Sequence, residues 1–281
     1  MENTVASEAS RLRRFSNWGS RQALGFGESL HSLGAFALIA LGVTVTKFRV
    51  SSRVMHPLIV REIHRFGVQL LPITAFFGAA LGLLIVGQTV PLFSQLGGRD
   101  HIGMVMVTVV VRELGPLAAA LLVLVRAGTV IVVELGTARA LGEVEALEAL
   151  GIDPVHYLVV PRLLGMMIAV LALTVYLILV AFGAGYLFAF LQGMPLQPAD
   201  YFGQIAGVLR WEDFVLLALK TITFGFAIAV IVCFEGLAQP LRLEDVPQAT
   251  TRAVGRCLTT CVLVDALFIV IYLYLDLYRF W

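Results

Sequence analysis

The sequence predicts an all-α, polytopic membrane protein with five transmembrane helices. Apolar residues make up 59% of the 281 residues and charged residues only 14%, whereas soluble domains contain about 45–50% and about 25%, respectively. The apolar residues form long unbroken runs, each long enough for a helix to cross the hydrocarbon core, and not the short alternating segments of a transmembrane barrel. These observations exclude a water-soluble enzyme and a disordered chain.

Residues 1–65 are the least apolar part of the chain and form a separate N-terminal segment. The segment holds nine Lys and Arg residues and one apolar stretch, 33–46, that is too short to span a membrane. Its basic flanks and Trp18 favour a helix lying in the membrane interface. A helix packed against the bundle is the alternative. Because the first residues are polar and rich in arginine, we expect no cleavable signal peptide.

Residues 66–281 form the membrane domain and contain the five expected spans. Gly78 and Gly82 form a G-x-x-x-G motif in the first span, which allows close approach of another helix. A short surface helix is expected at 198–208, in the outer loop 192–213 between the third and fourth spans. The spans are predicted at 66–92, 102–135, 157–191, 214–234 and 254–278.

The distribution of basic residues predicts the orientation. Five spans place the two termini on opposite sides of the membrane. With the N-terminus inside, the inner segments 1–65, 136–156 and 236–253 hold twelve Lys and Arg residues, and the outer segments hold three. Basic residues concentrate on the cytoplasmic side of membrane proteins. The N-terminus is therefore predicted to be cytoplasmic and the C-terminus to lie outside.

A short amphipathic helix is expected at about 137–151, in the cytoplasmic loop between the second and third spans. Ala, Leu and Glu favour helix formation, and Gly151 followed by Pro154 indicates where the helix ends. A helix this short needs a surface on which to pack. Three glutamates against one arginine favour a partner protein over anionic lipid as that surface. The apolar stripe of the helix consists of Leu141, Val144 and Leu147.

The second span contains four charged residues within apolar sequence: Arg112, Glu113, Arg126 and Glu134. A charged side chain near the centre of the membrane costs about 2.5–3.5 kcal/mol, and Pro116 favours a kink close to the first pair. Glu113 either lines a substrate path or forms a structural ion pair with Arg126 or Lys220. The chemistry of the residues leaves both interpretations open.

Asp265 lies within the last span, and we expect it to play a structural role by pairing with Arg126 or Arg162. The sequence contains no phosphate-binding loop, no zinc-protease motif and no hydrolase nucleophile motif. The three cysteines lie in apolar runs and no cluster of metal ligands is apparent, so neither a catalytic nor a metal site is predicted. A net charge of +1 gives no indication of nucleic-acid binding.

Several ordered motifs resemble those of a known family. Residues 112–116 read RELGP, 126–128 read RAG and 134–137 read ELGT, and they are followed by EVEALEALGIDPVHYLVVPR at 143–162 and ATTRAV at 249–254. Over residues 55–281 this pattern resembles the MlaE/YrbE-type permeases of ABC transporters that work with MCE proteins. The resemblance implies a homodimeric, non-catalytic permease that moves phospholipid between the inner membrane and a periplasmic MCE protein.

The resemblance also implies further partners and roles for particular residues. A cytoplasmic ABC ATPase would bind ATP and Mg²⁺, so that this chain binds no cofactor, and a STAS-domain protein would bind the ATPase. The helix at 137–151 would be the coupling helix, which contacts the ATPase through Glu143, Glu145, Leu147, Glu148 and Asp153. The lipid cavity would include Arg112, Glu113 and Leu114 and, from their placement in the first span, Ile85, Gln88, Leu92 and Phe93. Structural roles are expected for Arg126, Glu134, Arg162 and Asp265.

A proton-coupled secondary transporter that uses Glu113 and Asp265 is the alternative function. Such a carrier would need no ATPase, and it often contains two repeated halves. Five unequal spans do not fit that pattern. The acidic helix at 137–151 favours the ATP-driven permease, because a proton-driven carrier does not need it.

Overall fold

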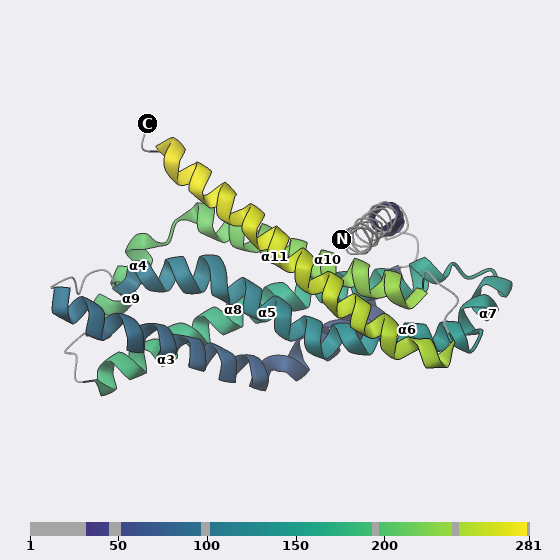
Figure 1. The fold of residues 1–281 in the computed structure, drawn as a ribbon, viewed down its shortest axis with the longest axis horizontal. Coiled ribbons are helices and arrows are strands. Elements are labelled where there is room, and N and C mark those ends of the chain that lie inside the picture. The colour runs from purple at the N-terminus through teal and green to yellow at the C-terminus, as the bar shows by residue number, and fades with distance from the viewer. Residues whose placement is uncertain (1–31, 45–51, 97–101, 193–196, 238–241, 280–281) are drawn as a thin grey trace, which may run out of the picture.

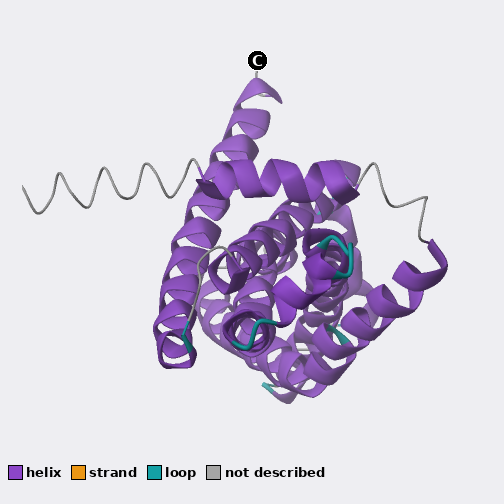
Figure 2. Ribbon diagram, turned by 90° about the vertical axis from the view of Figure 1, so that its right-hand side faces the viewer, coloured by secondary structure: helices purple, strands orange, loops and turns teal. Residues whose placement is uncertain are grey.

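The computed structural model describes residues 32–44, 52–96, 102–192, 197–237 and 242–279, and the regular structure in these ranges is helical throughout (Figure 2). Five helical segments are long and apolar enough to cross a membrane, which confirms the five expected spans. They pack into one elongated bundle (Figure 1). The spans are Met55–Thr89, Gly103–Ala140, Val155–Leu191, Trp211–Leu237 and Leu243–Leu275.

The first span begins earlier than the sequence predicts. Helix α2 (Ser52–Phe66) falls in the expected N-terminal segment, but it continues through Gly67 and a short 3₁₀ turn, η1 (Val68–Leu70), into α3 (Leu71–Leu96). The boundary expected at 65/66 falls at the end of α2, just before this turn. The turn separates two parts of one continuous span.

A short apolar helix, Ser32–Thr44, precedes the spans. Phe36 contacts Phe234 edge-on at a ring-centroid distance of 5.7 Å, and Ala40 is fully buried. Leu38 on the opposite face is exposed. The helix therefore packs on the bundle with one face, as in the alternative considered above. Trp18 lies outside the described residues, and the position of the helix at the membrane interface stays a prediction.

Wide π-helical turns occur in the second and third spans. Such turns occur at η3 (Met106–Leu114), just before Pro116, and at η5 (Val155–Val159), just before Pro161. A proline ring clashes with the carbonyl four residues earlier in a regular helix. At the end of η3 the N–H of Gly115 donates to the carbonyl of Val110, five residues back, so the helix widens and continues. The second span comprises α4 (Ile102–Val105), η3, α5 (Gly115–Val123), η4 (Leu124–Gly128) and α6 (Thr129–Ala140).

Helix α8 (Val160–Leu191) is the central helix of the bundle and packs against α2, α3, α5 and α10. The contact with α3 is very close at the G-x-x-x-G motif. A Cβ atom at Gly82 would lie 2.1 Å from the carbonyl oxygen of Ala181, and one at Gly78 would lie 2.8 Å from that of Leu177. The two glycines therefore allow direct backbone contact between α3 and α8, as the motif predicts.

The two ends of the bundle carry short helices. Helix α9 (Pro198–Val208) has the bounds that the sequence predicts, and it packs on α4 at one end (Figure 1). It is more than a surface helix, because its Tyr201 is fully buried and donates a hydrogen bond to the carbonyl of Phe182 at 3.4 Å. Burial raises the pKa of Tyr201 to about 12.

Helix α7 (Glu143–Ala149) lies at the opposite end of the bundle (Figure 1) and is shorter than the predicted 137–151. Residues 137–140 belong to α6. Gly142 and Gly151 flank α7 with φ angles of +77° and +74°, a region that favours glycine. These two left-handed residues set the direction of α7 relative to the spans on either side.

The last two spans are α10 (Trp211–Leu237) and α11 (Val246–Arg279), which follows a 3₁₀ turn, η6 (Leu243–Asp245). The C-terminal half of α11 leaves the bundle (Figure 1). Leu263, Leu267 and Val270 on this half are exposed. The face is apolar and free of contacts from the described chain.

Candidate functional site

Lys220 on α10 is fully buried and connects three helices. Its Nζ atom lies 3.2 Å from Oε2 of Glu113 on η3 and 2.7 Å from Oδ1 of Asp265 on α11. It also donates a hydrogen bond to the carbonyl of Arg112 at 2.8 Å. Of the two ion pairs considered for Glu113, the structure contains the one with Lys220.

The prediction that Asp265 pairs with Arg126 or Arg162 is wrong. Asp265 pairs with Lys220 on the neighbouring helix α10. Arg162 lies near the start of α8, at the α7 end of the bundle, and pairs there with Glu134. The sequence shows which spans hold the charges, but the level of each charge in the bundle decides which of them meet.

Arg112 forms a second ion pair beside Lys220. Its Nε atom lies 2.9 Å from Oδ1 of Asp213 at the start of α10, and its guanidinium lies 5.3 Å from the centroid of the Tyr272 ring. Asp213 also accepts a hydrogen bond from the backbone N–H of Arg210 at 3.0 Å. The sequence analysis missed Asp213, because an acidic residue in the first turn of a helix is ordinarily read as a cap.

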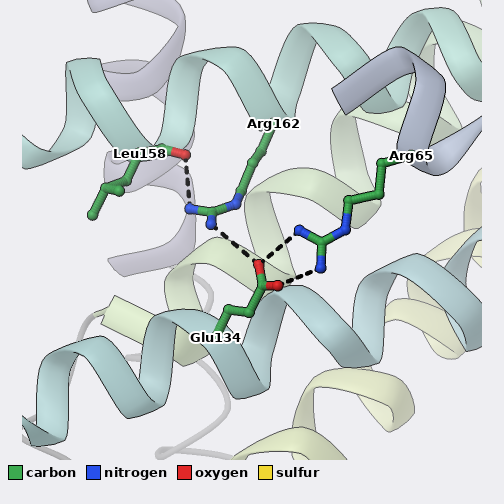
Figure 3. A network of polar contacts seen from close by, with 4 residues as sticks. All are labelled: Arg65, Glu134, Leu158 and Arg162. Carbon is green, nitrogen blue, oxygen red and sulfur yellow. Dashed lines mark hydrogen bonds and ion pairs between the residues drawn. The ribbon is translucent and has the colours of Figure 1, made fainter. Parts of the chain in front are cut away.

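Glu134 on α6 is the centre of a separate network near α7 (Figure 3). Both of its carboxylate oxygens accept hydrogen bonds from Arg65 on α2, and Arg162 on α8 donates to Oε2 at 3.3 Å. Arg162 also donates to the carbonyl of Leu158 at 3.1 Å. The network therefore links α2, α6 and α8. The sequence predicted structural roles for Glu134 and Arg162 but did not identify Arg65.

Two of the charge clusters along the spans include residues of the second span, and a third group joins Glu235 on α10 to Arg252 and Arg256 on α11. The α9-side cluster consists of Arg112, Glu113, Asp213, Lys220 and Asp265, and the α7-side cluster consists of Arg65, Glu134 and Arg162. Glu113 and Glu134 lie 21 residues apart on one span, which corresponds to about 31 Å at a helical rise of 1.5 Å per residue. A hydrocarbon core is about 30 Å thick. The separation of the two clusters is therefore close to the thickness of one hydrocarbon core.

The residues expected to line the cavity differ in exposure. The side chains of Arg112 and Glu113 are 15% and 28% exposed, and Leu114 and Gln88 reach the surface. Ile85 does not fit the prediction, because only 6% of it is exposed and it packs in the core between α3, η3 and α8. The side chains of Leu92 and Phe93 lie outside the described residues.

The acidic face of α7 is available to a partner. Glu143 and Glu148 are exposed and form no ion pair within the described residues, whereas Glu145 lies 3.2 Å from Arg139. Val144 is 2% exposed and holds the helix on the bundle, and Leu147 is half-buried beside it. The structure thus separates an anchored apolar face from an exposed acidic face.

Asp153 has a local structural role that the sequence analysis did not assign. Its Oδ1 atom accepts hydrogen bonds from the backbone N–H groups of Val155 at 3.0 Å and His156 at 3.4 Å. Asp153 therefore caps the start of η5. It fixes the path of the chain from α7 into α8.

The model of the Permease MlaE family matches residues 59–271 of the chain. The chain belongs to the MlaE permease family. The match includes the second, third and fourth spans, most of the first and fifth, and every residue of both charge clusters. The protein is thus a non-catalytic membrane subunit of an ABC transporter, and an ATPase subunit is its partner. This membership removes the support for a proton-coupled carrier.

Curated relatives of this permease agree with the family match. A probable ABC transporter permease of Rickettsia prowazekii is 28% identical over 86% of the chain and 92% of the relative. The intermembrane phospholipid transport system permease protein MlaE of Haemophilus influenzae is 26% identical over 79% of the chain and 85% of the relative. The chloroplastic protein TRIGALACTOSYLDIACYLGLYCEROL 1 of Arabidopsis thaliana is 25% identical over 94% and 73%.

Proposed function

We propose that two copies of this chain form the permease of an ABC transporter that moves phospholipid between the bacterial inner membrane and a periplasmic MCE protein. The observation that carries the proposal is the exposed acidic face of α7, held rigidly between two spans in a chain of the MlaE family. The name of the Haemophilus influenzae relative, an intermembrane phospholipid transport system permease, supports phospholipid as the cargo.

In this proposal α7 is the coupling helix and lies on the cytoplasmic side. ATP and Mg²⁺ bind to the ATPase, with a STAS-domain protein attached to it, and Glu143 and Glu148 bind basic or hydrogen-bond-donating groups on its surface. Because Val144 is buried against the bundle and Asp153 caps η5, displacement of α7 moves α6 and α8 together. Closure of the ATPase pair would thereby change the volume of a cavity between the two permease copies.

The α9-side cluster supplies the polar part of that cavity. Arg112 is partly exposed and would face the phosphate of the headgroup, and Glu113 is held by Lys220. This pairing reduces the repulsion between the Glu113 carboxylate and a phosphate. Leu114 and the exposed apolar face of α11 provide surface for acyl chains or for the second copy. The MCE protein would receive or supply lipid at this end.

The experiment that tests the proposal is mild-detergent purification of the tagged chain, with copurified proteins and lipids identified by mass spectrometry. The unmodified chain should retain an ATPase, an MCE protein and phospholipid. The triple variant Glu143→Ala, Glu145→Ala and Glu148→Ala should lose the ATPase and keep the phospholipid, because charge-assisted hydrogen bonds contribute about 1.5–3 kcal/mol each. Asp200→Ala, on the exposed surface of α9, is the control and should keep every component.

Two results would overturn the proposal. The first is recovery of the chain without an ATPase in several detergents. The second is a triple variant that binds the ATPase and supports lipid transfer at the level of the unmodified chain. The second result would reject α7 as the coupling helix even if the cargo is phospholipid.

A further inference from the structure

Arg126 differs in position from the other charged residues of the second span. Among the charged residues of that span, which the structure describes throughout, it is the one that lies between the levels of the two clusters. It is eight residues from Glu134 and 13 from Glu113, which places it about 12 Å and about 20 Å along the helix from these residues. Its Cα atom therefore lies within the apolar layer of the bundle.

Arg126 has no counter-ion in the described part of the chain. Its side chain is exposed, and no hydrogen bond or ion pair joins it to another described residue. Glu134, which lies eight residues further along the same span, already forms ion pairs with Arg65 and Arg162. A charged residue at this depth costs about 2.5–3.5 kcal/mol, and that cost falls when an anion neutralises it.

A pocket of about 300 Å³ lies directly at Arg126. One part of its wall is polar and contains two guanidinium groups and an amide, and the other part is apolar. The pocket opens between the end of α2 with η1 and the π-helical turn η4. The polar residues are Arg65, Gln69 and Arg126, and the apolar ones are Phe66, Leu70, Ala127 and Val130.

The surroundings of the pocket carry an excess of positive charge. Four arginines and two glutamates lie on the neighbouring parts of α2, η4, α6 and α8, which leaves an excess of two positive charges. Arg65 uses its two terminal nitrogens on Glu134 but keeps further N–H donors. An anion in the pocket would balance this excess. The residues counted are Arg61, Glu62, Arg65, Arg126, Glu134 and Arg162.

We propose that this Arg126 pocket binds the phosphate group of a membrane phospholipid. The α7-side cluster marks one edge of the hydrocarbon core, where lipid phosphates lie, and the arginine side chain can extend toward that edge. Guanidinium groups bind phosphate with paired hydrogen bonds, and the apolar wall accommodates the adjoining acyl chains. The pocket adds a lipid site at the α7 end to the one proposed at Arg112 and Glu113, and it rests on the proposed function only for the cargo class.

The test uses the full transporter complex in vesicles that contain equal amounts of phosphatidylglycerol and a diacylglycerol with the same acyl chains. A benzophenone amino acid replaces Gln69 in the pocket or, as a control position, Leu84 on the exposed face of α3. Lipid adducts formed on illumination are identified by mass. Position 69 should capture phosphatidylglycerol about tenfold more often than diacylglycerol, and position 84 should capture both equally.

The preference at position 69 should disappear with Arg126→Gln and persist with Arg139→Gln. Arg126 is exposed and unpaired in the described chain, so its loss leaves the packing intact, and Arg126→Lys should retain part of the preference. Equal capture of the two lipids at position 69, or a preference that survives Arg126→Gln, would overturn the proposal. So would adducts to a second copy of the chain, or loss of the preference when inorganic phosphate is added, since these show a protein contact or a soluble anion.

Lipid transfer by the same complexes separates this proposal from the proposed function. Transfer that continues while position 69 shows no preference rejects the Arg126 pocket alone. A preference at position 69 in a complex that transfers no phospholipid rejects the proposed function and leaves the pocket in place.

Discussion

At the scale of single residues, Lys220 holds the α9-side cluster together. One ammonium group faces the carboxylates of Glu113 and Asp265, and it is fully buried, so water does not screen these contacts. The three side chains carry one net negative charge when all are ionised. Removing the cation leaves two carboxylates close together, whereas removing Asp265 leaves one balanced pair.

Lys220→Met should therefore destabilise the protein more than Asp265→Asn does. Breaking a buried ion pair from one side costs about 3–5 kcal/mol, and here two carboxylates lose their partner at once. The free energy of unfolding in detergent, measured by titration with dodecyl sulfate, checks this order. Equal losses in the two variants, or a stable Lys220→Met protein, would show that the contacts to Lys220 contribute little.

The sequence identifies the charged residues of the spans but not all of their partners. Glu113 with Lys220 is one of two pairs that it allows, and Asp265 with Lys220 is not among its expectations. The reason is geometric: a contact between helices depends on their relative rotation and level, which local patterns do not encode. Asp213 and Arg65 could be found only by noting that Arg112 and Glu134 need partners at their own levels.

At the scale of helices, Gly82 has the tighter of the two glycine contacts between α3 and α8. A Cβ atom at Gly82 would meet the carbonyl oxygen, carbon and Cα of Ala181, which are backbone atoms and cannot rotate away. A Cβ atom added at Gly183 on α8 would instead lie in open space. These two glycines form a matched pair for substitution by alanine.

Gly82→Ala should destabilise the bundle by about 1–3 kcal/mol, because the added methyl group forces the two helices apart. Gly183→Ala should be neutral or stabilising, since alanine favours helix by about 1 kcal/mol over glycine. Thermal unfolding of the purified variants measures both effects. A Gly82→Ala protein as stable as Gly183→Ala would mean that α3 and α8 can separate without loss.

The regular elements are more predictable than their irregularities. The spans and α9 follow from long apolar runs and from Pro198, and the contact at Gly82 follows from the glycine spacing. A kink at Pro116 is predicted, but the structure distributes it over the wide turn η3. Helix α7 is shorter than predicted because Gly142 takes a left-handed conformation. The sequence alone does not show that a glycine within an Ala- and Glu-rich stretch adopts this conformation.

At the scale of the whole molecule, the bundle has two chemically distinct ends. Helix α7 lies at one end and α9 at the other (Figure 1). The Glu134 network is on the α7 side of the spans, and the Lys220 cluster is on the α9 side. The separation of the two clusters fits one bilayer thickness. The charge bias of twelve basic residues against three predicts that the α7 end is cytoplasmic, which coupling to an ATPase also requires.

Cysteine labelling in spheroplasts tests this orientation. The native cysteines Cys233, Cys257 and Cys261 are fully buried, so the unmodified chain should give no signal. Asp200→Cys on α9 should react with a membrane-impermeant maleimide in intact spheroplasts. Glu148→Cys on α7 should react only after the membrane is opened, because its end of the bundle carries the basic excess. The reverse pattern would place α7 outside the cell, where no ATPase could bind it, and would reject both the orientation and the coupling role of α7.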